Sequence, residues 1–243
     1  MDNPLVSMIM PTKNRVNFIL DAVRSITAQT YGNWELIILD ESSTNSTSEL
    51  IGILAKFDPR IRYVKVNRPL GLAKSRNVLL KLSRGELIGH IDDDDLLHEN
   101  ALETMVKEFE NDKELAMAYS DSFVIDEAGR VIGEKISPDF HKNNLINLGF
   151  NHFGMYRKNI ADMIGGFNEK VWCEDGDLFM RIAKNFRCKR VPGFLYYYRS
   201  HSTNFGHKRP VCKECDRQDV CNYYKIWNEE NNRLMKNSMQ ALP

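Results

Sequence analysis

The sequence predicts an α/β protein with a mostly parallel central sheet, helices on both faces and a short C-terminal helical appendage. Two observations carry this prediction. Short apolar runs alternate with segments of helical apolar periodicity throughout the first hundred residues. The length of 243 residues also suits one large domain with a small addition.

Four strand–helix units are predicted in the first half of the chain. Each strand is a short apolar run, and each helix has apolar residues at spacings of three and four. Pro11 is expected to end the first strand. The predicted strands span residues 6–10, 34–40, 61–66 and 86–92, and the predicted helices span residues 18–29, 44–56, 71–82 and 99–111.

The pattern becomes less regular after residue 112. Strands are predicted over residues 116–126, 130–133, 150–156 and 191–198, and helices over residues 159–164, 177–186 and 220–235. Residues 138–149 show no clear periodicity. We therefore expect one domain over residues 1–205, divided into halves at 1–112 and 113–205, and an appendage at 206–243.

Composition excludes several classes of protein. Lys plus Arg and Asp plus Glu both number 33, so the formal net charge is zero, which argues against binding nucleic acid. Neither a signal peptide nor an apolar run of spanning length is predicted. Five cysteines without an export signal favour reduced thiols in the cytoplasm, with peripheral contact at the inner face of a membrane as an option.

Polar residues follow the predicted strands, where a parallel sheet binds its ligands. Thr12, Asn14 and Arg15 come after the first strand, and Asp40 ends the second. Arg76 follows the third strand, at the start of a predicted helix. The sequence therefore predicts one binding site at this edge of the sheet.

Four adjacent carboxylates, Asp92-Asp93-Asp94-Asp95, end the fourth predicted strand. One or two of them could cap the next helix, where negative charge is favoured by about 0.3–1 kcal/mol each. Four repel one another, and a cation would offset that repulsion. Carboxylate oxygens with few other ligands suit Mg²⁺ or Mn²⁺ that holds a substrate phosphate.

A second acidic cluster is formed by Glu174, Asp175 and Asp177, just before a predicted helix. It can cap that helix, or it can supply a carboxylate that takes a proton from an attacking hydroxyl. Metal-assisted transfer to an alcohol requires one group of residues that binds the metal and another that supplies the base, and the two acidic clusters match this requirement.

Five motifs occur in the order of a known family: PTKNR at 11–15, the strand end at Asp40, GLAKSRN at 71–77, IDDDD at 91–95 and GGFNEKVWCEDGDLFMRI at 165–182. Over about residues 4–205 this series resembles the family 2 glycosyltransferases, inverting enzymes of the Rossmann-like GT-A fold. The family usually has a Gly where Ser42 follows Asp40-Glu41, so this turn is expected to be built differently.

The resemblance implies a nucleotide-sugar donor, typically linked to UDP, and a saccharide or lipid-linked glycan as acceptor. The first half of the domain would bind the nucleotide and the second half the acceptor. The residues expected to bind the nucleotide sugar are Thr12, Asn14, Arg15, Asp40, Arg76, Asp92, Asp93 and Asp95. Asp40 is similar to the acid that receives the base, and Asp95 to an acid that can touch the donor sugar.

The resemblance also implies the catalytic and metal-binding roles. Asp92 and Asp94 match the family's DxD pair, which binds Mn²⁺ or Mg²⁺. Asp175 matches the general base, with Glu174 beside it, and Trp172 resembles an acceptor-side wall. His201 can be a further metal ligand or a phosphate donor, or simply a histidine of a surface loop.

The tail offers four soft ligands within fifteen residues: His207, Cys212, Cys215 and Cys221. Their spacing partly matches a structural zinc site, and the alternative is unliganded thiols in a basic loop. Two other functions stay open. The chain can be a nucleotide- or glycan-binding module without turnover, or an interaction protein built on the tail zinc site. The sequence does not indicate an oligomeric state.

Overall fold

The computed structural model describes residues 3–137, 139, 153–171 and 173–204. The elements, in chain order, are β1 (Val6–Thr12), α1 (Val16–Thr27), β2 (Trp34–Asp40), α2 (Ser46–Phe57), β3 (Ile61–Lys65), α3 (Leu72–Leu82), β4 (Leu87–His90), β5 (Leu96–Leu97), α4 (Ala101–Asn111), β6 (Leu115–Ile125), β7 (Val131–Lys135), β8 (Gly154–Arg157), α5 (Lys158–Met163), α6 (Glu174–Asn185) and β9 (Arg187–Arg199).

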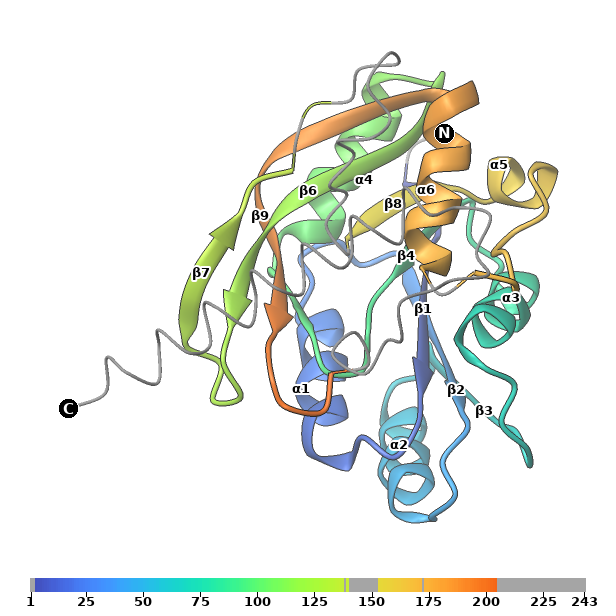
Figure 1. The fold of residues 1–243 in the computed structure, drawn as a ribbon, viewed down its shortest axis with the longest axis vertical. Coiled ribbons are helices and arrows are strands. Elements are labelled where there is room, and N and C mark those ends of the chain that lie inside the picture. The colour runs from blue at the N-terminus through green and yellow to red at the C-terminus, as the bar shows by residue number, and fades with distance from the viewer. Residues whose placement is uncertain (1–2, 138, 140–152, 172, 205–243) are drawn as a thin grey trace.

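The strands of the described residues form one sheet in the order β3-β2-β1-β4-β8-β6-β9-β5, with β7 paired to β6 (Figure 1). The β3-β2-β1-β4 part is parallel, as the alternation of strands and helices predicts. In the second half, β8 runs antiparallel to both β4 and β6, while β9 is parallel to β6. The predicted α/β class is therefore confirmed, with a mixed second half.

Two apolar clusters cover the two faces of this sheet. One contains buried side chains of α1, α2 and α4, such as Ile26, Ile51 and Met105. The other contains side chains of α3, α5 and α6, such as Leu79 and Phe179. The apolar face of each helix, read from its spacing, therefore packs on the sheet, and helices lie on both faces as predicted.

The first strand does not end at Pro11, as the sequence predicted, but continues to Thr12. The Thr12 carbonyl accepts from the Glu41 N–H on the side of β2, and the Ile9 carbonyl accepts from the Ile91 N–H on the side of β4. The backbone groups of even-numbered residues of β1 therefore face β2, and those of odd-numbered residues face β4. The nitrogen of Pro11 therefore faces the side of β4, whose pairing with β1 has already ended at Ile9. A missing N–H costs nothing at that position.

Several other boundaries differ from the prediction by a few residues, and two of them concern the site. β4 ends at His90 rather than Asp92, so the whole Asp tetrad lies in a loop. Helix α6 begins at Glu174 rather than Asp177, so its acidic cluster forms the first helical turn. The two-residue strand β5, which pairs with β9, is too short to show any periodicity in the sequence.

Helix α6 approaches the sheet closely because β8 begins with a glycine. A Cβ on Gly154 would lie 2.5 Å from the ring of Phe179. Only hydrogen at this position lets the Phe179 ring rest on the strand. The close contact fixes the height of α6 above the sheet.

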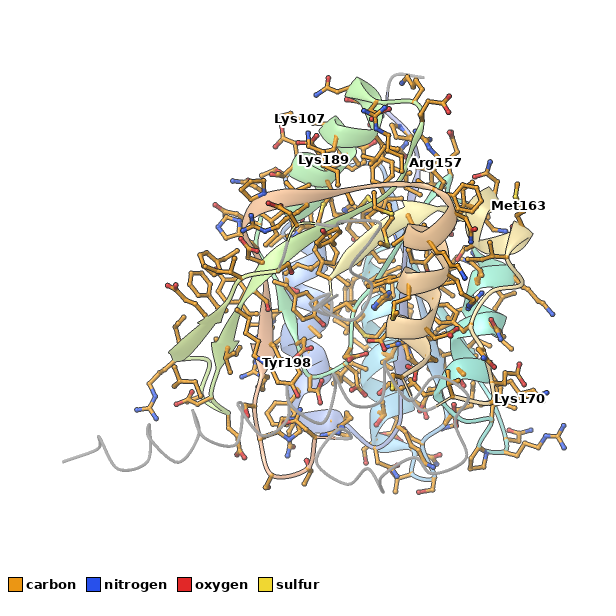
Figure 2. All side chains as sticks on the ribbon, turned by 45° about the horizontal axis from the view of Figure 1, so that its top comes forward. Lys107, Arg157, Met163, Lys170, Lys189 and Tyr198 are labelled. Carbon is orange, nitrogen blue, oxygen red and sulfur yellow. The ribbon has the colours of Figure 1, made fainter. Side chains whose placement is uncertain are left out.

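Polar contacts join α4 to the second half of the sheet. Lys189 of β9 pairs with Glu108 of α4, and Arg157 Nη2 of β8 donates to the Phe109 carbonyl of α4 at 3.3 Å (Figure 2). In the described part of the chain, no helix combines the length and apolarity that crossing a membrane requires. The predicted tail helix and the predicted zinc ligands His207, Cys212, Cys215 and Cys221 lie outside the described residues, as does Trp172.

Candidate active site

The loop after β1 lies against the Asp tetrad, which follows β4. The Thr12 hydroxyl donates to Asp93 Oδ2 at 2.6 Å. Arg15 places its Nε 3.9 Å from Asp93 Oδ1 and its Nη2 3.5 Å from Asp94 Oδ2. Asn14 adopts a left-handed φ of 58°, and its backbone N–H donates to the Ser42 hydroxyl at 2.8 Å. The structure thus brings together residues that the sequence placed after three different strands.

The four aspartates of the tetrad make different sets of contacts. Asp92 Oδ1 accepts from Arg76 at 2.6 Å, and Asp94 Oδ2 lies 2.9 Å from His201 Nε2. Asp93 faces Thr12, as described above. Asp95, which is fully buried, accepts from the Tyr196 hydroxyl at 2.6 Å and from the Arg199 backbone N–H at 2.7 Å. These two contacts tie the loop to β9.

The tetrad fits a divalent cation. One carboxylate oxygen from each of Asp92, Asp94 and Asp95 lies within 4.8 Å of the other two. Burial, followed by the neighbouring Asp94 carboxylate, raises the pKa of both Asp93 and Asp95 well above the usual value. A cation held by hard oxygen ligands would offset this repulsion. The residues therefore suit Mn²⁺ or Mg²⁺ chemically.

Arg76, from the second turn of α3, joins the tetrad to the acidic turn of α6. Its side chain is 1% exposed, and its Nη1 donates to Glu174 Oε1 at 2.6 Å while its Nη2 bonds to Asp92. Asp175 Oδ2 lies 4.0 Å from the same Nη1. One buried guanidinium therefore organises both acidic clusters that the sequence singled out.

The acidic cluster of α6 divides into separate roles. Asp177 Oδ2 accepts from Arg181 Nε at 2.7 Å, within the helix. Glu174 pairs with Arg76, and Asp175 Oδ1 accepts from the Gly176 backbone N–H at 2.8 Å. All three acids lie in the first turn, where the helix dipole favours negative charge. The helix terminus therefore stabilises the cluster and points Asp175 into the region of Arg76.

Asp40, at the end of β2, is fully buried and serves as an anchor. Its Oδ1 accepts from the Ser42 N–H at 2.7 Å, and its Oδ2 accepts from Tyr63 at 2.9 Å and from Lys65 at 3.1 Å. Burial by itself would raise the pKa of Asp40, but these hydrogen bonds hold it below the usual value. These contacts hold the turn after β2 in shape, and the contact of Asp40 with a base stays a prediction.

Two residues of the site were not anticipated. Glu41 accepts from the Leu70 N–H at 2.9 Å and from the Ser75 hydroxyl, so it joins the β2 turn to the start of α3. Thr203 accepts from Arg15 Nη1 at 3.0 Å through its hydroxyl and from Nη2 at 2.9 Å through its carbonyl. The segment after β9 thereby returns beside the start of α1 (Figure 1).

Comparisons with known proteins show which family of sequences this chain is similar to. A family model described as "Glycosyl transferase family 2" matches residues 7–167. A chondroitin synthase of Pasteurella multocida (strain Pm70) is 30% identical over 234 residues, which are 95% of this chain and 23% of that protein. The chain spans about a fifth to a third of the length of the curated relatives that it matches first.

Solved structures show the same fold. TarS 1–349 of S. aureus in complex with UDP has a TM-score of 0.65 at 20% identity, covering 83% of this chain and 62% of that one. A mannosyltransferase from Pyrobaculum calidifontis in complex with GDP-Man and Mn²⁺ has a TM-score of 0.68 at 17% identity, covering 99% of this chain and 76% of that one.

Proposed function

Because the chain belongs to glycosyltransferase family 2, we propose that it transfers a sugar from a nucleotide-linked donor to a glycan hydroxyl. The observation that carries this proposal is Arg76, which links the carboxylates suited to a cation with the acids of α6. The two parts of a metal-assisted transfer site thus meet around one buried side chain.

We propose UDP as the nucleotide and a saccharide or lipid-linked glycan as the acceptor. TarS has been solved with UDP and with UDP-GlcNAc, and the Pasteurella relative is a polysaccharide synthase. The mannosyltransferase has been solved with GDP-Man, so a guanine nucleotide is the alternative to UDP in the donor. Residues 1–112 would hold the nucleotide and residues 113–205 the acceptor.

The reaction would be a single in-line displacement. The acceptor oxygen bonds to the anomeric carbon on one face while the bond from that carbon to the diphosphate oxygen breaks on the other, and Asp175 takes the acceptor proton. Glu174 is already engaged by Arg76 at 2.6 Å, which favours Asp175 as the base. Inversion at the anomeric carbon follows from this geometry.

Positive charge in the site would stabilise the departing diphosphate. Mn²⁺ or Mg²⁺ held by Asp92 and Asp94 would supply part of it when bound. Thr12 at the end of β1, with Asn14 and Arg15 in the loop after it, would orient the nucleotide, and Arg15 is set toward Asp94. Arg76 would hold Asp92 and Glu174 in place.

The test is a transfer assay with a panel of UDP-sugars and GDP-mannose, Mn²⁺ and saccharide acceptors. We expect one donor to release its nucleoside diphosphate faster when one acceptor is present, and NMR of the product to show an inverted anomeric configuration. Binding of nucleotide without turnover of any donor would favour the silent binding module. A product with retained configuration would contradict the role of Asp175.

A further inference from the structure

One asparagine of α3 holds the loop that follows α5. Asn77 Nδ2 donates to the Phe167 carbonyl at 2.9 Å, and Asn77 Oδ1 accepts from the Phe167 backbone N–H at 2.8 Å. The amide of Asn77 therefore satisfies both backbone groups of Phe167, as a neighbouring strand would. We call residues 164–169 the glycine loop, because Gly165 and Gly166 lie within it.

The two glycines allow this close approach. Gly165 and Gly166 have left-handed φ values of 84° and 70°, which residues with a side chain rarely adopt. A Cβ on Gly166 would also lie 2.6 Å from Asn77 Oδ1. The glycine at position 166 is therefore required both by its own backbone conformation and by the room that Asn77 needs.

Helix α6 holds the glycine loop from the other side. Arg181 Nη1 donates to the Ile164 carbonyl at 2.8 Å, and Arg181 Nη2 donates to the Gly166 carbonyl at 2.5 Å. Arg181 Nε bonds to Asp177 at 2.7 Å, which fixes the direction of the guanidinium. Since α3 and α6 lie on the same face of the sheet (Figure 1), the glycine loop acts as a spacer between the two helices.

Helix α3 therefore holds α6 at two points, through two consecutive residues. Arg76 reaches the first turn of α6 directly at Glu174, and Asn77 reaches α6 through the glycine loop. The Phe167 ring, which is 2% exposed, also lies against the Arg76 guanidinium, whose carbon is 5.8 Å from the ring centroid. A single contact would let the helix pivot, whereas two contacts fix its direction. Asp175, in the same turn as Glu174, is thereby set relative to the tetrad, which Arg76 also holds.

We propose that Asn77 is a positioning residue for sugar transfer. It fixes the direction of α6 so that the Asp175 carboxylate meets the acceptor hydroxyl, and it touches neither substrate itself. The inference rests on the proposed function, since it takes Asp175 as the base. A misplacement of about 1 Å at the reacting atoms can cost about 100-fold in rate. The donor should still bind, because Tyr196 and Arg199 of β9 hold the tetrad independently at Asp95.

The first test separates turnover from donor binding. Asn77→Ala removes both hydrogen bonds to Phe167, so we expect kcat for transfer to fall by about 10- to 100-fold while the Kd for UDP in Mn²⁺ stays within about threefold of wild type. Asn77→Asp keeps an acceptor for the Phe167 N–H but turns a carboxylate toward the Phe167 carbonyl, and it should show the same split. An Asn77→Ala protein with wild-type kcat would overturn the proposal. So would a parallel loss of UDP binding, kcat and Tm, because Asn77 would then only support the fold.

Two control variants accompany this test. Glu169→Ala removes the third contact of the Asn77 amide, which lies on the exposed side of the glycine loop at 3.2 Å. Asn185→Ala removes a hydrogen bond at the far end of α6, where Asn185 Nδ2 donates to the Arg181 carbonyl at 3.0 Å. Both should keep kcat within about twofold of wild type, as exposed substitutions usually have small effects. Losses equal to that of Asn77→Ala would mean that any loosening of α6 slows transfer, and would contradict the role given to Asn77.

Hydrogen exchange of the ligand-free protein tests the contact itself. In Asn77→Ala the Phe167 amide should exchange faster, and so should the Asp177 amide, which bonds to the Cys173 carbonyl and closes the first turn of α6. Unchanged exchange at both amides would overturn the proposal.

Failure of the proposed function would look different. If the wild-type protein transferred no sugar from any donor, the proposed function would fail, and the role of Asn77 in transfer would fail with it. If the wild-type protein were active and Asn77→Ala matched it, this inference alone would fail.

Discussion

Asp175→Asn should lower the rate of sugar transfer by about 100-fold or more, with the affinity for UDP and Mn²⁺ within about twofold of wild type. The asparagine keeps the shape of the side chain and its acceptor oxygen for the Gly176 N–H, but it cannot take the acceptor proton. Initial rates at saturating donor, together with calorimetric titration of UDP, separate the two effects.

The matched control is Asp177→Asn, in the same turn of α6. It removes the same charge from the same helix terminus, but its side chain pairs with Arg181. Transfer should stay within a few-fold of wild type. If both variants lost activity equally, the acidic turn would act through its charge, and Asp175 would not be the base.

Asp94→Ala should abolish the dependence of UDP binding on Mn²⁺. In the presence of Mn²⁺ we expect the affinity for UDP to fall by about 100-fold, or about 2.7 kcal/mol, because the cation loses a ligand and its charge no longer reaches the diphosphate. Titrations of UDP in Mn²⁺ and in chelator measure this directly.

Asp93→Asn is the control for the second prediction. Asp93 belongs to the same tetrad but faces Thr12, and an amide oxygen can still accept from that hydroxyl. This variant should keep its response to Mn²⁺. An Asp94→Ala protein with unchanged affinity for UDP would mean that Asp94 does not hold the cation.

The sheet could be predicted because its first half is built from local signals. Buried parallel strands are mostly apolar, as in residues 34–40, where Glu35 and Asp40 are the charged exceptions, and each is followed by a helix of clear periodicity. The ends of the strands are not set by such local signals. The strand before the tetrad ends at His90, since the last residue pair between β1 and β4 is Ile9 with His90, and that pairing is not visible in the sequence.

The residues that form the site could also be predicted from the sequence, but the contacts of their side chains could not. Four adjacent aspartates look alike in the sequence, and only tertiary contacts separate them. Asp95 is engaged by Tyr196, about a hundred residues away, while Asp93 is engaged by Thr12.

Asp40 shows the same limit. Its place at a strand end is visible in the sequence. Its role as an anchor depends on the register that sets Lys65 beside it. Thr203 carries no distinctive signal at all, because a threonine in a polar loop is common.

The roles of Trp172 and of the four tail ligands stay predictions, since these residues lie outside the described part of the chain. The cytoplasmic location and the membrane contact expected from the sequence stay predictions as well.

The central claim is a metal-dependent site for a nucleoside diphosphate, and thermal unfolding tests it most directly. The wild-type protein would be heated with UDP, GDP, ADP, CDP or TDP, each with Mn²⁺ and with chelator. At a hundred times its Kd, a ligand stabilises the folded state by about 2.7 kcal/mol. We predict that UDP raises Tm with Mn²⁺ and that chelator removes the shift. No shift with any nucleotide, or a shift that chelator leaves unchanged, would contradict the account.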